Sequence, residues 1–209
     1  MKKNKVFWML FVLSMAVKAQ YTTYKMDNVG SISISDDMEL QSGDYREMTS
    51  ELHQKILHIN PQNRIVFQPK GLNEFQKESK EVYVRIIINT LYGEYESLSN
   101  DKSQISVEEL QELNKIYKEL AIRESQIFEG GRLIYFHGVS VESVNNQVCT
   151  KWSYTRQYNN EPIVKVEVYD FLNKDRAHRL IFSYRASESH LWKYKLKNTL
   201  NSLKITRIN

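Results

Sequence analysis

The chain has 209 residues, of which 29 are Lys or Arg, 25 are Asp or Glu, and 41% are hydrophobic. It contains only seven Gly and three Pro, a composition that excludes a low-complexity or disordered chain. The single cysteine, Cys149, excludes an intramolecular disulfide, so a packed core must stabilise the protein without a covalent cross-link.

The first 19 residues predict a secretory signal peptide. Met1–Lys5 is basic, Val6–Val17 is apolar, and Val17 and Ala19 stand at positions −3 and −1 of a cleavage site. The apolar run is shorter than the roughly 20 residues that a membrane-spanning helix needs. No cysteine stands at the cleavage point, which argues against lipoprotein processing. We therefore expect cleavage after Ala19 and a mature chain that begins at Gln20.

Removal of residues 1–19 changes the charge of the protein. That segment contains four lysines and no acidic residue, so residues 20–209 contain 25 basic and 25 acidic residues. A neutral surface attracts polyanions weakly, which argues against nucleic acid or an anionic membrane as a partner. The mature length predicts a single domain over residues 20–209 with one sizeable core.

Alternating apolar and polar residues predict strands, and apolar residues at spacings of three and four predict helices. In chain order, the sequence predicts a strand over 30–35, a helix over 46–59, strands over 64–68 and 81–90, a helix from the capping box Ser106-x-x-Glu109 to Ile127, strands over 132–141, 147–158, 163–171 and 178–185, and a helix over 187–202. Asparagines occur at the joins between the last four strands, where hairpin turns need residues that tolerate a left-handed backbone. Such short connections favour antiparallel neighbours.

The final helix is predicted to pack through one apolar stripe. Trp192, Leu196 and Leu203, together with Thr199 or Leu200, recur at helical spacing. A run of strands bracketed by amphipathic helices predicts an α+β fold. We expect an antiparallel β-sheet flanked by α-helices, with the C-terminal helix packed on the sheet.

Two parts of the chain resemble the PsbP-like superfamily, which includes DcrB-like proteins. They are Ile32–Leu40 (ISISDDMEL) near the start, and Leu180–Tyr184 (LIFSY), Trp192 and Leu200–Lys204 (LNSLK) near the end. The superfamily includes photosystem extrinsic subunits, periplasmic DcrB-type proteins and Ran-binding Mog-type proteins. The resemblance implies an antiparallel sheet flanked by helices that serves mainly as a non-enzymatic adaptor or assembly scaffold. It carries no family-wide catalytic residues over to this chain.

The five histidines, His53, His58, His137, His178 and His190, do not form a metal-binding motif. His53 and His58 are separated by about 140° around a helix, whereas a metal pair at i,i+4 shares one face. The chain also has no His-Glu-x-x-His motif and no paired cysteines. We predict no metal site and no cofactor.

Cys149 is the only thiol, and His137 is the histidine considered as its partner in nucleophilic catalysis. In the strand 147–158, Trp152 and Tyr154 are expected to face the core, and Cys149 to face the other way with Lys151. A lone cysteine in a strand is more often inert packing than a nucleophile. No Gly-x-Ser-x-Gly elbow marks a serine nucleophile, so no catalytic residue is predicted.

Two acidic clusters have alternative roles. Asp36-Asp37-x-Glu39 offers oxygen ligands for a cation but lacks the spacing of an EF-hand loop. Glu108-Glu109-x-x-Glu112 stands at the start of a predicted helix, where carboxylates favour the helix dipole, so capping is the preferred role.

Aromatic residues are abundant, with thirteen Tyr, eight Phe and three Trp. They cluster at Tyr92–Tyr95 (YGEY) and at Trp152–Tyr158 (WSYTRQY). Tyr, Trp and Arg concentrate in interface hot spots, so these stretches suit a binding surface. Aromatic packing between neighbouring strands explains the same pattern and is favoured.

Together these features favour an exported, non-catalytic protein, periplasmic or secreted, that binds an unknown protein partner in the envelope or outside the cell. The competing hypothesis is a small-molecule or lipid binder with a pocket between sheet and helices. No nucleic-acid partner and no stable membrane span after signal cleavage are expected. A closed space between sheet and helices would favour a scaffold, and a deep apolar pocket a carrier. Converging polar groups in such a pocket would favour an enzyme.

Overall fold

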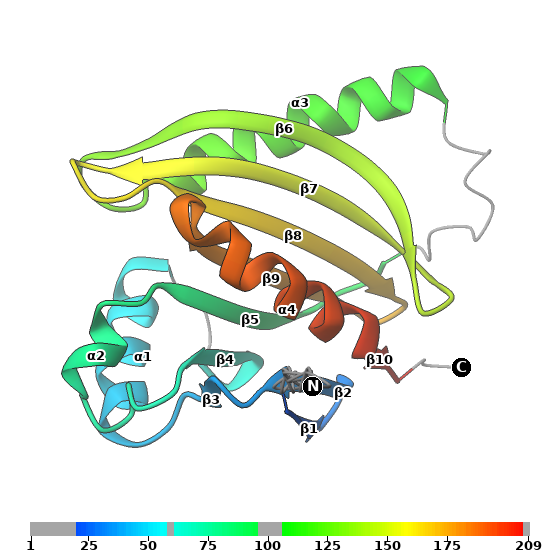
Figure 1. The fold of residues 1–209 in the computed structure, drawn as a ribbon. Coiled ribbons are helices and arrows are strands. Elements are labelled where there is room, and N and C mark those ends of the chain that lie inside the picture. Colours follow the sequence, from blue (N-terminus) through cyan, green and yellow to red (C-terminus); the bar gives the residue numbers. More distant parts are fainter. Residues whose placement is uncertain (1–19, 58–60, 96–105, 207–209) are drawn as a thin grey trace, which may run out of the picture.

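The computed structural model describes residues 20–57, 61–95 and 106–206 (Figure 1). The predicted signal peptide, residues 1–19, lies outside these ranges. The strands form a three-stranded sheet in the order β1 (Tyr21–Met26), β2 (Gly30–Ser35), β10 (Lys204–Ile205), and a seven-stranded sheet in the order β3 (Met38–Leu40), β4 (Arg64–Pro69), β5 (Val84–Tyr92), β9 (Arg176–Arg185), β8 (Val164–Asn173), β7 (Gln147–Tyr158), β6 (Gly131–Val144). The helices are α1 (Gly43–Leu57), α2 (Lys77–Lys80), α3 (Val107–Ser125) and α4 (Ser189–Ser202). All strand pairs are antiparallel, so the predicted α+β fold is confirmed.

The hairpin turns between the last four strands follow the predicted chemistry. Asn145 and Asn146 join β6 to β7 with φ angles of 48° and 62°, the left-handed values that a type I′ turn requires. Asn159 follows β7 with φ 46°, and Lys174 joins β8 to β9 with φ 57°. These turns set the register that brings particular side chains onto each face of the sheet.

One face of the seven-stranded sheet is covered by α4 and the three-stranded sheet, and we call it the closed face. Its side chains from the central strands are Val84, Ile86, Ile88, Leu180, Phe182 and Tyr184, each exposed by 2% or less. The stripe of α4 packs on them with Trp192, Leu196 and Leu200, and Leu203 follows just past the helix. Figure 1 shows α4 lying across the sheet on this side. The predicted docking of the C-terminal helix is confirmed.

The three-stranded sheet joins the two ends of the described chain. β2 pairs with β1 along its length and, on its other side, with β10 through Ser31–Lys204 and Gly30–Ile205. Gly30 has a φ of 137°, and a Cβ at this position would overlap the Lys204 carbonyl. Only glycine therefore permits this close pairing. Neither β1 nor β10 is predicted from the sequence.

The opposite face of the same sheet, which we call the open face, is covered by α3 on its β6–β7 side. Trp152, Tyr154 and Val168 pack there against Ala121, which is fully buried in α3. The capping box of α3 is present, with Ser106 Oγ accepting from the Glu109 amide at 3.1 Å and Glu109 Oε2 accepting from the Ser106 amide at 2.7 Å.

The sequence predicts two apolar stripes that are partly wrong. They are Met48, Leu52, Ile56 and Ile59 in the first helix, and Val107, Leu110, Leu113, Ile116, Leu120 and Ile127 in the helix that follows the capping box. In α3, Val107 and Ile116 are 69% and 50% exposed, because the helix turns its small residues Ala121 and Ser125 toward the sheet. In α1, Met48 is 54% exposed rather than buried. The side chains of Leu52 and Ile56 and the whole of Ile59, which complete that predicted stripe, lie outside the described part of the structure.

Candidate functional site

The histidines considered as metal ligands are dispersed. His178 is buried in β9, His137 lies in β6, and His190 is exposed on α4. The side chain of His53 and the whole of His58 fall outside the described residues. Within the residues that the structure describes, no three His, Cys, Asp or Glu side chains gather in a way that could hold a metal ion.

Cys149 and His137 do not form a nucleophilic pair. Cys149 is opposite Glu142 in the β6–β7 ladder, whereas His137 lies in the irregular stretch beside Gly138, which is opposite Ser153. The structure also corrects the environment of Cys149. It does face away from Trp152, but this second side of the strand is part of the closed face, where the cysteine is fully buried. A thiol buried among apolar side chains is inert.

Both acidic clusters have structural partners. Asp36 accepts a hydrogen bond from Thr22 at 2.9 Å, and Glu39 accepts one from the Asn73 amide at 2.8 Å. Asp37 pairs with Lys195 on α4, and this contact is the main cause that lowers the pKa of its carboxyl. The second cluster supplies the capping box of α3 through Glu109. These contacts fasten loops and helices.

A cleft of about 450 Å³ lies over the open face, between α1 and α3. We call it the arginine cleft. Its lining consists of Gln41, Tyr45, Thr49, Arg64, Val66, Tyr83, Arg85, Ile87, Asn89, Leu91, Glu124, Ile127, Phe128, Tyr154, Arg156, Tyr158, Val166, Arg179, Ile181 and Ser183. Its volume lies in the range of ordinary ligand sites.

Strand register arranges the floor of the arginine cleft in rows across the sheet. One row is polar and runs Arg64, Asn89, Arg179, Asp170 from β4 to β8. The adjacent row is apolar and runs Val66, Ile87, Ile181, Val168. A third row begins at Arg85, opposite Ser183, and continues to Val166 and Tyr154. The cleft therefore has a charged row, an apolar row and a second charged end.

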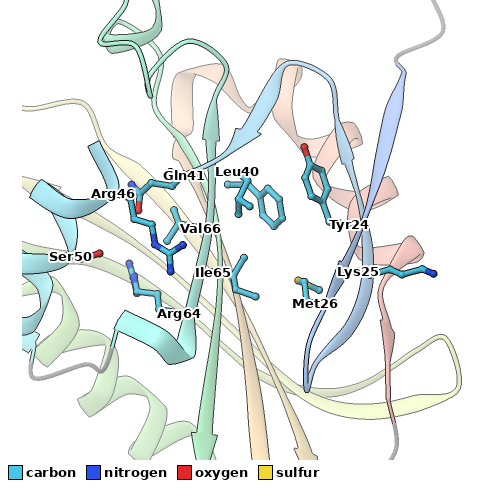
Figure 2. Close-up of a pocket in the computed structure, with 11 residues that line it drawn as sticks. Tyr24, Lys25, Met26, Leu40, Gln41, Arg46, Ser50, Arg64, Ile65 and Val66 are labelled. Carbon is cyan, nitrogen blue, oxygen red and sulfur yellow. The ribbon is translucent and has the colours of Figure 1, made fainter. Parts of the chain in front are cut away.

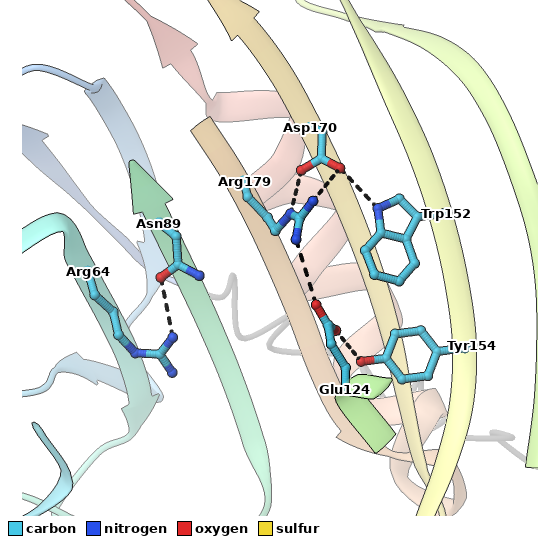
Figure 3. A network of polar contacts seen from close by, with 7 residues as sticks. All are labelled: Arg64, Asn89, Glu124, Trp152, Tyr154, Asp170 and Arg179. Atoms are coloured by element: carbon cyan, nitrogen blue, oxygen red, sulfur yellow. Dashed lines mark hydrogen bonds and ion pairs between the residues drawn. The ribbon is translucent and has the colours of Figure 1, made fainter. Parts of the chain in front are cut away.

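Arg179 is fully paired (Figure 3). Its Nε donates to Asp170 Oδ1 at 2.6 Å and its Nη2 donates to Asp170 Oδ2 at 3.2 Å, while Glu124 lies 3.7 Å from Nη1. Trp152 Nε1 donates to Asp170 Oδ2 at 3.1 Å, and Tyr154 Oη donates to Glu124 at 2.7 Å. One arginine facing two carboxylates leaves this group with a formal charge of −1.

Arg64 and Asn89 occupy the other side of the same row, with Arg64 Nη1 donating to Asn89 Oδ1 at 3.3 Å (Figure 3). Burial lowers the pKa of Arg64 to about 10. The guanidinium therefore stays charged at neutral pH, where the pKa lies well above the pH.

Arg85 and Arg156 form the second charged end of the cleft around Tyr83. The Arg85 guanidinium lies 5.5 Å from the centre of the Tyr83 ring, and Arg156 is hydrogen-bonded to Tyr83 and lies 5.1 Å from the centre of the Tyr158 ring. Burial alone would raise the pKa of Tyr83, but the charges of Arg156 and Arg85 and a hydrogen bond with Ser183 hold it below its ordinary value. The local field at this end is strongly positive.

The two arginines of this end lack acidic partners among the described residues. Arg85 donates to the Val84 carbonyl at 2.8 Å and to Tyr45 Oη at 3.4 Å, and the ion pairs found in these ranges do not include Arg85 or Arg156. The buried Nε of Arg156 has no hydrogen-bond partner there. Buried donors are normally satisfied, so an unpaired one points to a missing acceptor.

Two other pockets are less well suited to a ligand. A pocket of about 150 Å³ between β1, β4 and α1 is lined by Tyr24, Met26, Leu40 and Phe67 together with Arg46 and Arg64 (Figure 2). A third, of about 400 Å³ beside α4 on the closed face, mixes the lysines 151, 193 and 197 with Glu142 and Glu167. The first is small, and the charges of the second balance more evenly than those of the arginine cleft.

In the aromatic stretch Trp152–Tyr158, the favoured aromatic packing is present, and some of its residues also line the arginine cleft. Trp152 and Tyr154 stack on each other with ring centres 5.5 Å apart, and Tyr117 packs against Trp152 at 5.2 Å. Tyr154, Arg156 and Tyr158 also line the arginine cleft. Of the other stretch, Tyr92 is exposed, with the Arg176 guanidinium 5.4 Å from its ring centre.

Arg64, Arg85 and Arg179 are not predicted from the sequence as site residues. A local signal exists for the last two, because Arg85 lies between Val84 and Ile86 inside a strand, and Arg179 lies inside a strand just before the apolar run 180–182. An arginine at such a position must either find a partner on the second face of the sheet or line a cavity there.

Chemically, this arrangement suits binding. The lining of the cleft contains one carboxylate, Glu124, which is engaged by Tyr154 and Arg179. Ser183 is present, but within the described ranges the lining brings no histidine or cysteine to activate it. Charged guanidinium groups and tyrosine rings are groups that hold anions and flat surfaces.

No family model and no curated protein matches this chain. Solved structures do share its fold. Cyanobacterial PsbP (CyanoP) from Synechocystis sp. PCC 6803 is 9% identical with a TM-score of 0.53, covering 94% of this chain and 99% of that one. The Ran-binding protein Mog1p of Saccharomyces cerevisiae is 11% identical (TM-score 0.46, 91% and 97% covered), and LpqN of Mycobacterium tuberculosis, involved in cell envelope biogenesis, is 14% identical (0.44, 92% and 87%). The likeness to CyanoP shows that the fold is PsbP-like, as the resemblance implied.

None of the helices in the described ranges is both long enough and apolar enough to cross a membrane.

Proposed function

We propose that this protein is an exported, non-catalytic binding module, a single domain of residues 20–209 that acts after removal of the signal peptide 1–19. It binds a protein partner in the envelope or outside the cell, and the arginine cleft is its binding site. The observation that carries the proposal is the convergence of Arg64, Arg85, Arg156 and Arg179 with tyrosines in the cleft on the open face of the sheet. Tyr and Arg are the residues that dominate binding hot spots.

A second candidate function is the binding of a small molecule or lipid. It is favoured by the concave shape of the cleft, its volume of about 450 Å³ and the apolar row that includes Ile87 and Ile181. Such a pocket, apolar with a few convergent polar groups, is typical of small-molecule sites.

The test is capture from envelope extract with the protein in the form that the cell accumulates, followed by mass-spectrometric identification of bound proteins and small molecules. We expect a specific partner to be retained by the wild type and by Arg123→Gln, whose side chain is exposed on α3 outside the cleft. The variants Arg85→Gln and Arg156→Gln should lose it. Retention of the partner by both cleft variants would place the binding site elsewhere on the surface.

Export is tested separately by the intact mass of the accumulated protein. We expect a chain that begins at Gln20, because Ala19 precedes the predicted cleavage point. A product that retains residues 1–17 would contradict both export by cleavage and the neutral charge of the mature chain.

A further inference from the structure

The arginines of the cleft differ in whether acidic side chains balance their charge. Four arginines line the cleft against one carboxylate, Glu124. Arg179 is paired with Asp170 and Glu124. Arg64 is hydrogen-bonded to Asn89 and makes a further interaction. The positive charge that acidic groups of the described chain leave uncompensated is therefore that of Arg85 and Arg156, at the Tyr83 end.

The geometry of this end suits an oxyanion. A guanidinium presents donors in a planar fork that matches carboxylate and phosphate oxygens. The Arg85 guanidinium lies 5.5 Å from the centre of the Tyr83 ring, and Arg156 is hydrogen-bonded to the same tyrosine, so both positive charges stand at one end of the cleft. An oxyanion seated at this end would offset both charges.

The rest of the cleft sets a second requirement on the occupant. The row next to Arg85 is apolar, with Ile87 and Ile181 on its partly exposed section. Rows on one face of a strand are about 7 Å apart, because they are two residues apart and each residue rises roughly 3.3 Å. Beyond the apolar row, the group of Arg179, Asp170 and Glu124 carries a formal charge of −1. A second anionic group at that end would meet these carboxylates.

We infer that the arginine cleft takes an anionic amphiphile, with one carboxylate or phosphate held by Arg85 and Arg156 and an apolar body on Ile87 and Ile181. The inference rests on the second candidate function and specifies its ligand class. The inference excludes three other occupants. A neutral apolar molecule would leave the two guanidinium groups unpaired, and an inorganic anion would leave the apolar row exposed to water. A polyanion would be repelled by the carboxylates of Asp170 and Glu124.

The test is isothermal titration calorimetry of the accumulated protein with decanoate and with decyl phosphate, each below its critical micelle concentration. The comparison probes are decanol, decyltrimethylammonium, inorganic phosphate and a glutamate-rich peptide. We expect both decyl anions to bind at least tenfold more tightly than every comparison probe. Binding should strengthen roughly threefold for each methylene added from hexanoate to decanoate, because each one buries further apolar surface.

The protein side of the test uses matched variants. Arg85→Gln and Arg156→Gln should each weaken decanoate binding at least tenfold, whereas Arg123→Gln should leave it unchanged. Circular dichroism and the urea midpoint show whether each variant is folded. If a cleft variant fails to fold, protection of Arg156 from guanidine-modifying reagents by decanoate in the wild type provides the equivalent measurement.

Several outcomes would overturn the inference: no binding of either decyl anion, equal binding of decanol or decyltrimethylammonium, tighter binding of phosphate or of the acidic peptide, or unchanged affinity in both arginine variants. These outcomes leave the proposed function intact if capture of a protein partner still depends on Arg85 and Arg156. Conversely, decanoate binding without any captured partner would refute the protein-partner proposal and support the ligand.

Discussion

The two faces of the seven-stranded sheet are built by the same strands but differ in their side chains and in what covers them. In β5, Val84, Ile86 and Ile88 point to the closed face and are buried, while Arg85 and Asn89 point to the arginine cleft on the open face. The closed face is covered by α4 and the three-stranded sheet, whereas the described residues leave a cleft over the open face between α1 and α3. Alternation along a strand therefore lets one side build the core while the other lines a cleft.

The largest expected effect tests the closed face. Trp192 is 6% exposed and packs with Leu196 and Leu200 beneath α4. Truncation in Trp192→Ala leaves a cavity, so we expect a loss of about 3–5 kcal/mol in the free energy of unfolding. Urea denaturation followed by circular dichroism measures it.

Lys195→Ala is the matched control on the same helix. Lys195 pairs with the half-exposed Asp37, and an exposed ion pair contributes less than about 1 kcal/mol. A Trp192→Ala protein that is as stable as the wild type but no longer binds its partner would make Trp192 a surface anchor and refute the closed-face assignment.

The second effect is a dependence of stability on pH. Burial, with the charge of Arg176 as the next cause, lowers the pKa of His178 to about 4, and its Nδ1 lies 3.1 Å from Thr90 Oγ1. Above pH 6.5 the ring is neutral in both states and has no effect. Below it, the unfolded chain takes up the proton first, so stability falls as the pH drops from about 6.5 toward 4, by up to ~3 kcal/mol.

Urea midpoints measured at pH 7, 6, 5 and 4 check this slope. His178→Gln should be less stable at pH 7 and should show a flatter profile of stability against pH over the same window. Titration of the carboxylates contributes equally to both proteins. An identical slope in wild type and variant would mean that His178 takes up its proton at the same pH in the folded and unfolded states.

The third effect concerns the ion-paired group of Arg179, Asp170 and Glu124 on the open face. Asp170→Asn keeps the size of the side chain but removes the charge that Arg179 needs and places an amide donor beside Trp152 Nε1. Because Glu124 still faces Arg179, we expect a loss of about 2–3 kcal/mol, somewhat less than for a buried pair broken completely. The exposed Asp175→Asn, beside Arg176, should leave the urea midpoint unchanged. Equal midpoints for the two variants would contradict the buried network.

The smallest expected effect on stability concerns Arg85 on the open face. Arg85→Gln removes a cation that has no acidic partner among the described residues, together with its hydrogen bonds to the Val84 carbonyl and to Tyr45. We expect the free energy of unfolding to change by no more than about 1 kcal/mol, while binding falls. A loss comparable to that of Asp170→Asn would show that Arg85 supports the fold and is not kept for a ligand.

Elements whose signals are local could be predicted from the sequence. The capping box at Ser106, the asparagine turns at 145–146 and the apolar stripe from Trp192 to Leu203 each depend on residues a few positions apart, and all are present. β10 could not be predicted, because its two residues pair only with β2, at the opposite end of the chain. Strand pairing over such a separation leaves no local periodicity.

The arginine cleft could be anticipated only in part. The stretch Trp152–Tyr158 marks one wall, since its aromatic and arginine residues are neighbours in sequence. Arg64, Arg85 and Arg179 come from β4, β5 and β9, and only the register of these strands brings them together. The cleft that the described residues leave between α1 and α3 is likewise a tertiary property. Composition suggested a neutral surface, and the concentration of charge in one place depends on the fold.

The pairing of β2 with β10 has a consequence for when the molecule can fold. Because ribosomes deliver the chain from its N-terminus, Ile32 and Ile34 must wait for Leu200, Leu203 and Ile205 before the closed face is sealed. Pairings this far apart are slow to form. The core of the closed face is therefore completed only after β10 has been synthesised.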